Sequence, residues 1–216
     1  MLKIENLTKK YGDKTVYENF NLEIEKDKIT VILGESGSGK TTLLNVLAHL
    51  TDYQGTVSGI ENDKISFVFW QNRLVDCLTV IKNLKLTNPT ATDEEIIKIL
   101  TELGIGDTIN LYPKSLSAGM QRRVAIARAL LKKAPLVLMD EPFINLDLAL
   151  KLRLINLFKD RQKNAPTTAI IVTHDIKEAV LIADRIIVLA NGKIIYDENN
   201  ICDKTEDKLF DILSKR

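Results

Sequence analysis

Nine consecutive residues have the types and spacing that bind a polyphosphate: Gly34-Glu35-Ser36-Gly37-Ser38-Gly39-Lys40-Thr41-Thr42. An apolar run, 29–33, precedes them and apolar residues at helical spacing follow, so the segment joins a strand to a helix. Its glycines let backbone N–H groups turn inward, and the positive end of the helix dipole faces the same concavity. Lys40 would reach the β- and γ-phosphates, and the Thr41 hydroxyl would supply one Mg²⁺ ligand. The pattern therefore predicts the phosphate-binding loop of a nucleotide hydrolase, and the flanking elements disfavour a chance Gly/Ser turn.

Two adjacent carboxylates, Asp140 and Glu141, end a second apolar run, Leu136–Met139. Open α/β sheets bind ligands at the carboxyl edge of their strands, which is where this pair would lie. Asp140 is expected to hold Mg²⁺ beside Thr41. Glu141 is expected to point the other way, because side chains alternate along a strand, and to polarise the attacking water. An acidic cap on the next helix is the alternative, which the phosphate loop in the same chain disfavours.

The composition is that of a globular protein with one substantial core: 216 residues, 45% hydrophobic and 27% charged. Thirty basic and 29 acidic residues leave a formal charge of +1 with no long run of one sign, which argues against a nucleic-acid partner. Cys77 and Cys202 are isolated, which favours a reducing compartment and structural roles over a zinc site or a disulfide. The chain starts without a secretory signal pattern and contains no apolar stretch long enough to span a bilayer, so a membrane role would require a partner.

Hydrophobic periodicity predicts strands at the start of the chain, a helical insert from about residue 72, and βαβ units after it. The expected strands are 2–7, 16–24, 29–33, 56–58, 65–69, 136–139 and 168–172, with a hairpin of 186–189 and 193–196 around Asn191-Gly192. The expected helices are 78–86, 94–103, 118–133, 147–163 and 207–215. Thr92 marks a helix start and Gly104 a helix end.

Five motifs together, in order and spacing, resemble an ABC transporter ATPase subunit over nearly the whole chain. They are the segment 34–42, Leu116-Ser117-Ala118-Gly119-Met120, Asp140-Glu141-Pro142, Asn145-Leu146-Asp147 and His174. The resemblance implies an α/β fold in one domain, 1–216. A P-loop NTPase core with a mainly parallel sheet would comprise 1–71 and 135–216, with an N-terminal antiparallel β subdomain and an inserted α-helical subdomain at 72–134.

The same resemblance implies an ATPase that binds ATP and Mg²⁺ and couples hydrolysis to transport. Its partners would be a membrane permease, a second ATPase subunit in an ATP-dependent homodimer and, indirectly, a solute-binding protein. Its location would be cytoplasmic, on the inner face of the cell membrane. The motifs look most like those of nitrate, sulfonate and taurine-type importers.

Individual roles follow from this resemblance. Ser117 and Gly119 would cap ATP bound by the opposite subunit, and the helix N-terminus behind them suits an anion. Tyr11 would stack on adenine, with a core or surface tyrosine as the alternative. Asp147 would contact the partner subunit, and it can also be the N-cap of the next helix. His174 would sense the γ-phosphate, with an ordinary surface histidine as the alternative.

The chain departs from the family pattern at two places. The segment 116–120, called the signature segment below, resembles the family's LSGGQ signature. Ala118 stands where that signature usually has glycine, and its methyl group could crowd a close backbone approach. Trp70 stands where the family has a Mg²⁺-ligating glutamine, and Gln71 follows it. Either a local shift brings Gln71 to the metal, or Trp70 replaces the ligand. Two alternatives stay open: a soluble ABC ATPase without a permease, and a catalytically weak ATP-binding module, which the departures at Trp70 and Ala118 suggest.

Overall fold

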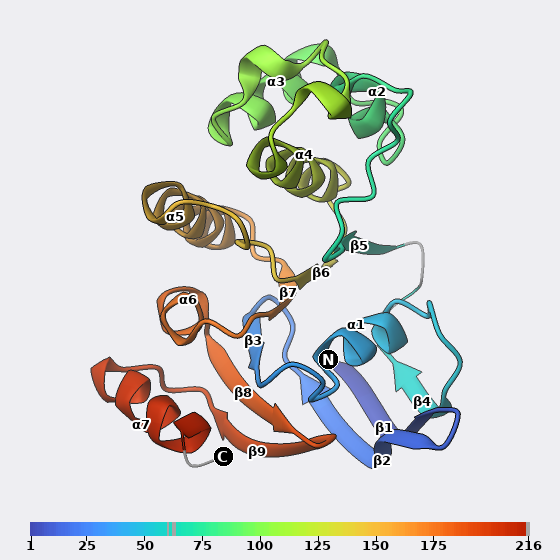
Figure 1. The fold of residues 1–216 in the computed structure, drawn as a ribbon, viewed down its shortest axis with the longest axis vertical. Coiled ribbons are helices and arrows are strands. Elements are labelled where there is room, and N and C mark those ends of the chain that lie inside the picture. The colour runs from blue at the N-terminus through green and yellow to red at the C-terminus, as the bar shows by residue number, and fades with distance from the viewer. Residues whose placement is uncertain (60, 62–63, 215–216) are drawn as a thin grey trace.

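The computed structural model describes residues 1–59, 61 and 64–214, and its largest element is a six-stranded sheet (Figure 1). The strand order is β5-β6-β7-β3-β8-β9. The strands are β5 (Ile65–Val68), β6 (Leu136–Asp140), β7 (Thr168–Val172), β3 (Ile29–Leu33), β8 (Arg185–Ala190) and β9 (Lys193–Glu198). All neighbours pair in parallel except β8 and β9, which form the expected hairpin. Every residue of β3, β6 and β7 is buried, which is why these strands are continuous apolar runs.

A second, antiparallel sheet has the order β2-β1-β4, from β1 (Leu2–Tyr11), β2 (Lys14–Ile24) and β4 (Gln54–Ser58). The prediction ended the first strand at residue 7 and was too short. Pairing with β2 continues to Tyr11, and Gly12 turns the chain with φ 55°. This pairing between strands outweighs the low strand propensity of Lys9 and Lys10. Tyr11 is thereby held at the end of a strand.

Two apolar cores lie on the two faces of the large sheet. On one face Val31 and Leu33 pack in a cluster with residues of α5 (Leu148–Asn164), α6 (Ile176–Ile182) and α7 (Asp203–Ser214). On the other face Ile32 packs with residues of α1 (Lys40–Leu47) and of the antiparallel sheet. Figure 1 shows α5, α6 and α7 on one side of the large sheet and α1 on the other. The expected fold class, with a mainly parallel sheet and a separate antiparallel one, is confirmed.

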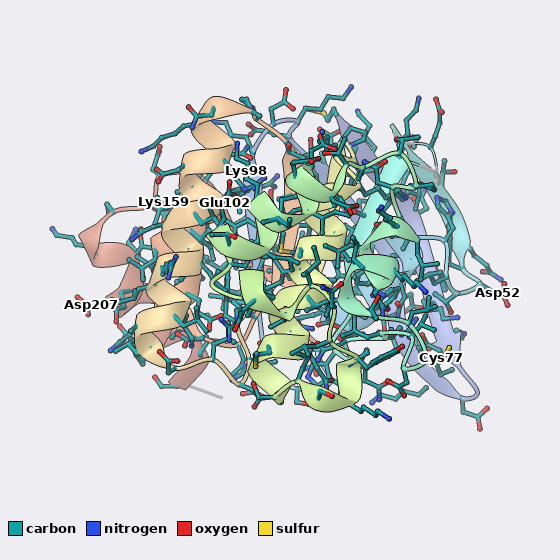
Figure 2. The ribbon with its side chains drawn as sticks, turned by 90° about the horizontal axis from the view of Figure 1, so that it is seen from above. Asp52, Cys77, Lys98, Glu102, Lys159 and Asp207 are labelled. Atoms are coloured by element: carbon teal, nitrogen blue, oxygen red, sulfur yellow. The ribbon has the colours of Figure 1, made fainter. Side chains whose placement is uncertain are left out.

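The helical region consists of α2 (Val80–Lys85), α3 (Asp93–Glu102) and α4 (Ala118–Leu131), with short 3₁₀ turns at Gly106–Thr108 and Pro113–Ser115. Thr92 and Glu95 form a capping box at the start of α3, and Gly104, with φ 68°, follows its end, as predicted. Figure 2 labels Glu102 of α3 close to α5, where its carboxylate pairs with Arg161 at 2.5 Å. This ion pair ties the helical region to the core.

Three predictions about elements and side chains need correction. α6 was missed, although Asp175 accepts hydrogen bonds from the N–H groups of Lys177 and Glu178 as its N-cap. α7 begins four residues before the predicted 207, and Lys215, its predicted end, lies outside the described residues. Cys77 and Cys202 are both exposed, so neither contributes to the core. None of the helices in the described part of the chain is long and apolar enough to cross a membrane.

Candidate functional site

A cavity of about 590 Å³ opens at the carboxyl ends of β3, β6 and β7, beside the turn between β1 and β2. It brings together most of the residues that the sequence singled out. Its lining contains Tyr11, Lys14, Val16, Ser36, Gly37, Gly39, Lys40, Thr41, Thr42, Trp70, Asp140, Glu141, Ile144 and His174.

The loop between β3 and α1 has the predicted strand–loop–helix form, and two of its glycines are required by space. At Gly39, φ is 109°, and a Cβ would lie 2.7 Å from the Tyr17 hydroxyl oxygen. That buried hydroxyl donates to the Gly39 carbonyl at 3.0 Å. At Gly34, a Cβ would lie 2.3 Å from the backbone oxygen of Leu189. Any larger residue at either position would displace the loop.

Lys40 is buried at the start of α1, and its ammonium group lies over the loop. Its Nζ donates to the backbone oxygens of Gly34 at 2.7 Å and Glu35 at 2.8 Å. Burial lowers the pKa of Lys40, and the nearby carboxylates of Glu141 and Asp140 oppose that shift. The site therefore contains a desolvated cation, which a polyphosphate would stabilise.

Three residues of the loop, Gly34, Glu35 and Ser38, lie outside this cavity lining. The hydroxyl of Ser38 is buried and has no hydrogen-bond partner among the described residues, while its backbone N–H donates to the Glu35 oxygen at 3.2 Å. The Ser38 carbonyl accepts from the N–H of Gly192 at 3.4 Å. The β8–β9 turn therefore contacts the loop from outside, and Glu35 and Ser38 contribute to the shape of the loop.

Thr41 and Asp140 meet directly, as the metal hypothesis requires. The Thr41 hydroxyl donates to Asp140 Oδ2 at 2.8 Å, and Asp140 is 2% exposed. Burial raises the pKa of Asp140, partly offset by the bond from Thr41. A hydroxyl and a carboxylate oxygen are hard donors of the kind that Mg²⁺ prefers, and a bound cation would compensate the buried charge. The residues present therefore fit Mg²⁺.

Glu141 lies beside Asp140 in the same cavity, which corrects the expectation from strand alternation. β6 ends at Asp140, and Glu141 takes the left-handed conformation with φ 49°. This conformation is uncommon for a residue with a Cβ, and it redirects the side chain. The carboxylate Oε1 lies 2.8 Å from Nδ1 of His174, which follows β7. An acid–base pair therefore faces the end of the phosphate loop.

The loop that carries His174 is braced from α5. Lys151 pairs with Asp175 at 3.1 Å and with the buried Glu178 at 2.6 Å. Asp147 is the N-cap of α5 and accepts from the N–H of Leu150 at 2.9 Å. The capping alternative for Asp147 is therefore confirmed, while its contact with a partner subunit stays a prediction.

Trp70 and Gln71 lie in different surroundings. The Trp70 side chain is part of the cavity lining and is 56% exposed. Gln71 lines a neighbouring hollow of about 390 Å³, together with Asn72, Gln121 and Asn145. Trp70 and Ile144 border both spaces. The arrangement favours Trp70 over Gln71 as the residue beside the phosphates.

Tyr11 presents half of its side chain to solvent at the rim of the cavity. The buried Lys9 places its ammonium 4.4 Å from the centre of the Tyr11 ring and donates to the Asp52 carbonyl at 2.6 Å. The Lys9 cation therefore lies against the ring, and half of the side chain stays exposed, as the predicted stacking on adenine requires.

Ser117, Gly119 and Asp147 are absent from the cavity lining that the described residues form. Ser117 is the N-cap of α4, and its hydroxyl accepts from the N–H of Met120 at 3.2 Å. A Cβ on Gly119 would meet only ordinary contacts near 3.5 Å, at Asn145 and Leu146. The signature segment therefore forms the start of α4 and lies outside the cavity that contains the phosphate loop.

Arg122 is the residue of this region that sequence reasoning did not single out. It is 2% exposed and contacts the backbone of both the Asp140–Pro142 turn and the segment after β5. The run 124–131 begins two residues later and is apolar except for Arg128. This run was a signal that Arg122 would be buried too.

Comparison with known proteins gives consistent results. The family model described as ABC transporter matches residues 17–144. The aliphatic sulfonates import ATP-binding protein SsuB of Delftia acidovorans is 39% identical over 197 residues, covering 90% of this chain and 81% of that protein. SsuB 1 of Paracoccus denitrificans (strain Pd 1222) is 40% identical over 198 residues, with the same shares covered.

Two solved structures have similar folds. The dimeric, post-hydrolysis structure of the ATP-binding cassette MJ0796 bound to ADP and Pi is 33% identical, with a TM-score of 0.83. The match covers 92% of this chain and 98% of that one. An ATP-binding subunit of an ABC transporter, 21% identical with a TM-score of 0.84 over 99% of this chain and 94% of that one, shares the fold.

Proposed function

Because this chain belongs to the ABC transporter family, as an ATP-hydrolysing subunit that works with a separate membrane permease, we propose that it energises the import of aliphatic sulfonates or closely related small anions. The names of the relatives support this cargo. One observation carries the enzymatic part: Lys40, the Thr41–Asp140 pair and the Glu141–His174 pair line a single cavity.

In the proposed mechanism, the loop and the Lys40 ammonium bind the β- and γ-phosphates of ATP. Thr41 and Asp140 hold Mg²⁺, which neutralises phosphate charge when bound. The Glu141 carboxylate accepts a proton from the attacking water. His174 orients that carboxylate through the 2.8 Å contact and would sense the γ-phosphate. Tyr11 stacks on adenine, with Lys9 behind its ring.

The proposed working unit is a head-to-tail homodimer in which each ATP lies between two subunits. Ser117 and Gly119 of one copy, at the start of α4, would cap the ATP bound by the other, and Asp147 would contact the partner. Two observations support this assembly. The signature segment lies outside its own subunit's cavity lining, and the similar MJ0796 cassette was solved as a dimer with ADP and Pi.

The same proposal divides the chain into a nucleotide-binding core, 1–71 and 135–216, and a signature-bearing helical part, 72–134. Helices α2, α3 and α4 all fall within the second range. The chain would lie on the cytoplasmic face of the cell membrane, bound to its permease, and a solute-binding protein would act through that permease.

Growth on defined sulfur sources tests the cargo. A strain lacking this chain should grow on sulfate and fail on an alkanesulfonate as sole sulfur source. The wild-type gene should restore growth, while Lys40→Ala, expressed to the same level, should not. Normal growth of the deletion strain on alkanesulfonates would exclude this cargo, leaving the ATPase assignment to be tested on purified protein.

A further inference from the structure

Arg122, in the first turns of α4, is a buried cation held by backbone groups. Among the described residues, it is the bulkiest side chain that is fully buried. Its guanidinium forms no ion pair with any carboxylate of those residues. Burial lowers the pKa of Arg122 to about 10, with opposing contributions from Asp140 and Glu141, so the side chain is still charged at neutral pH. A charge buried in this way requires many hydrogen bonds.

One half of those hydrogen bonds goes to the turn after β6. Nη2 donates to the carbonyl oxygens of Asp140 at 2.5 Å and Glu141 at 2.7 Å, and Nε donates to that of Pro142 at 3.1 Å. Successive carbonyls of an extended strand point in opposite directions, so three of them reach one guanidinium only where the strand is broken. The left-handed Glu141 provides that break.

The other half goes to the segment after β5. Nη1 donates to the carbonyl oxygens of Phe69 and Trp70 and to Oδ1 of Asn72, the last two at 3.3 Å. The planar fork of five N–H donors on arginine makes such a bridge between two chain segments possible, and lysine lacks that geometry. Arg122 therefore joins the segment that contains Trp70 to the turn that carries both catalytic-site carboxylates.

Arg128, two turns along α4, provides a comparison. It donates to the carbonyl oxygens of Asn72 at 3.0 Å and Arg73 at 2.8 Å. It therefore holds the segment after β5, and among the described residues it has no hydrogen bond to the turn after β6. Of these two arginines, Arg122 alone bridges both segments, and it is the one nearer to Ser117, the N-cap of α4.

We propose that Arg122 is a positioning residue for hydrolysis. It fixes the backbone of Asp140–Pro142 against the backbone of Phe69–Asn72. This sets the positions of the Glu141 carboxylate and the Asp140 metal ligand relative to the γ-phosphate. The inference rests on the proposed roles of Asp140 and Glu141. Through Arg122, helix α4 directly contacts both Asp140–Pro142 and Phe69–Asn72, so a rigid movement of α4 would be transmitted to these two segments.

The test compares purified wild-type protein with Arg122→Gln, Arg122→Lys, Arg128→Gln and Arg185→Gln. Arg185 is a partly buried arginine bonded to Asp197 and to the Glu23 carbonyl, away from the cavity, and it controls for loss of stability. For Arg122→Gln we expect kcat to fall about tenfold or more, because small displacements of catalytic groups cost rate steeply. KM for ATP should stay within about twofold, and the Mg²⁺ concentration for half-maximal turnover should rise several-fold.

The kcat of Arg122→Lys should lie between those of the wild type and Arg122→Gln, since one ammonium can hydrogen-bond to only one of the two segments. If Arg122→Gln does not fold, Arg122→Lys is used in its place. Trp70 is the single tryptophan, so its fluorescence reports on Phe69–Asn72 directly. Its response to Mg-ATP should change in both Arg122 variants, and Arg128→Gln should leave the Mg²⁺ requirement unchanged.

Unchanged kcat and Mg²⁺ requirement in folded Arg122 variants would overturn the inference, as would equal losses in Arg185→Gln or a parallel loss of ATP binding. Absence of turnover in the wild-type protein together with its permease would instead refute the proposed function.

Discussion

Nδ1 of His174 lies 2.8 Å from Oε1 of Glu141, and the two residues follow neighbouring parallel strands, β7 and β6. The histidine side chain is 67% exposed and the glutamate side chain 14%. The contact therefore joins a group at the open side of the cavity to one at its inner wall. This geometry suits a carboxylate that is held in place while it takes a proton.

Glu141→Gln should slow ATP hydrolysis about a hundredfold or more while ATP binding persists, because general-base action typically contributes that much. The amide can still bond to His174, so the shape of the site is retained. In Mg-ATP the variant should accumulate as a dimer, measured by light scattering. Parent-like hydrolysis or a monomer in Mg-ATP would show that Glu141 has another role.

Asp140→Asn should stabilise the nucleotide-free protein at pH 7, because it removes a buried charge. The folded-state pKa of Asp140 is raised above 3.8 by burial, so ionisation costs stability above that folded-state pKa. The cost is relieved as pH falls through the folded-state pKa toward 3.8, and the wild type should then approach the variant.

Thermal unfolding with and without Mg-ATP measures this effect. In a chain of this size, each kcal/mol in the free energy of unfolding shifts Tm by about 2–4 °C. Adding Mg-ATP should stabilise the wild type more than the variant, since only the wild type retains the carboxylate ligand. A variant that is less stable at pH 7 without nucleotide would contradict the prediction.

Trp70→Gln should raise ATP hydrolysis or Mg²⁺ affinity, because it introduces an amide oxygen where the indole offers only an N–H donor. Gln71→Ala, the matched control one residue away, should have little effect, since Gln71 lines the neighbouring hollow. Steady-state kinetics over a Mg²⁺ titration distinguishes the two. Loss of turnover in Gln71→Ala with no change in Trp70→Gln would identify Gln71 as the ligand.

Ser117→Arg should abolish ATP-driven dimerisation and leave ATP binding to the monomer intact, because in the proposed dimer a bulky side chain at the start of α4 would collide with the partner's ATP. Gel filtration with and without Mg-ATP measures assembly, and calorimetry measures binding. Equal loss of both would place Ser117 in its own subunit's pocket.

Features that depend on neighbours in the sequence were predictable. The phosphate loop follows from closely spaced glycines between a strand and a helix, and the capping box of Thr92 and Glu95 spans four residues. The buried parallel strands were visible as apolar runs. The whole of α6 was missed because a helix of seven residues is too short to show a clear period, although Asp175 and Glu178 had capping spacing.

By itself, the sequence determined the phosphate loop, the candidate carboxylates and the family resemblance, because each depends on residue types at fixed local spacing. The tertiary structure confirmed that Thr41 meets Asp140 across 99 residues, and it alone decided that Glu141 turns into the same cavity and that Arg122 bridges two segments. These contacts follow from the order β5-β6-β7-β3, which places distant strand ends side by side. Long-range packing sets that order and the left-handed backbone at Glu141, and local propensity carries no information about either.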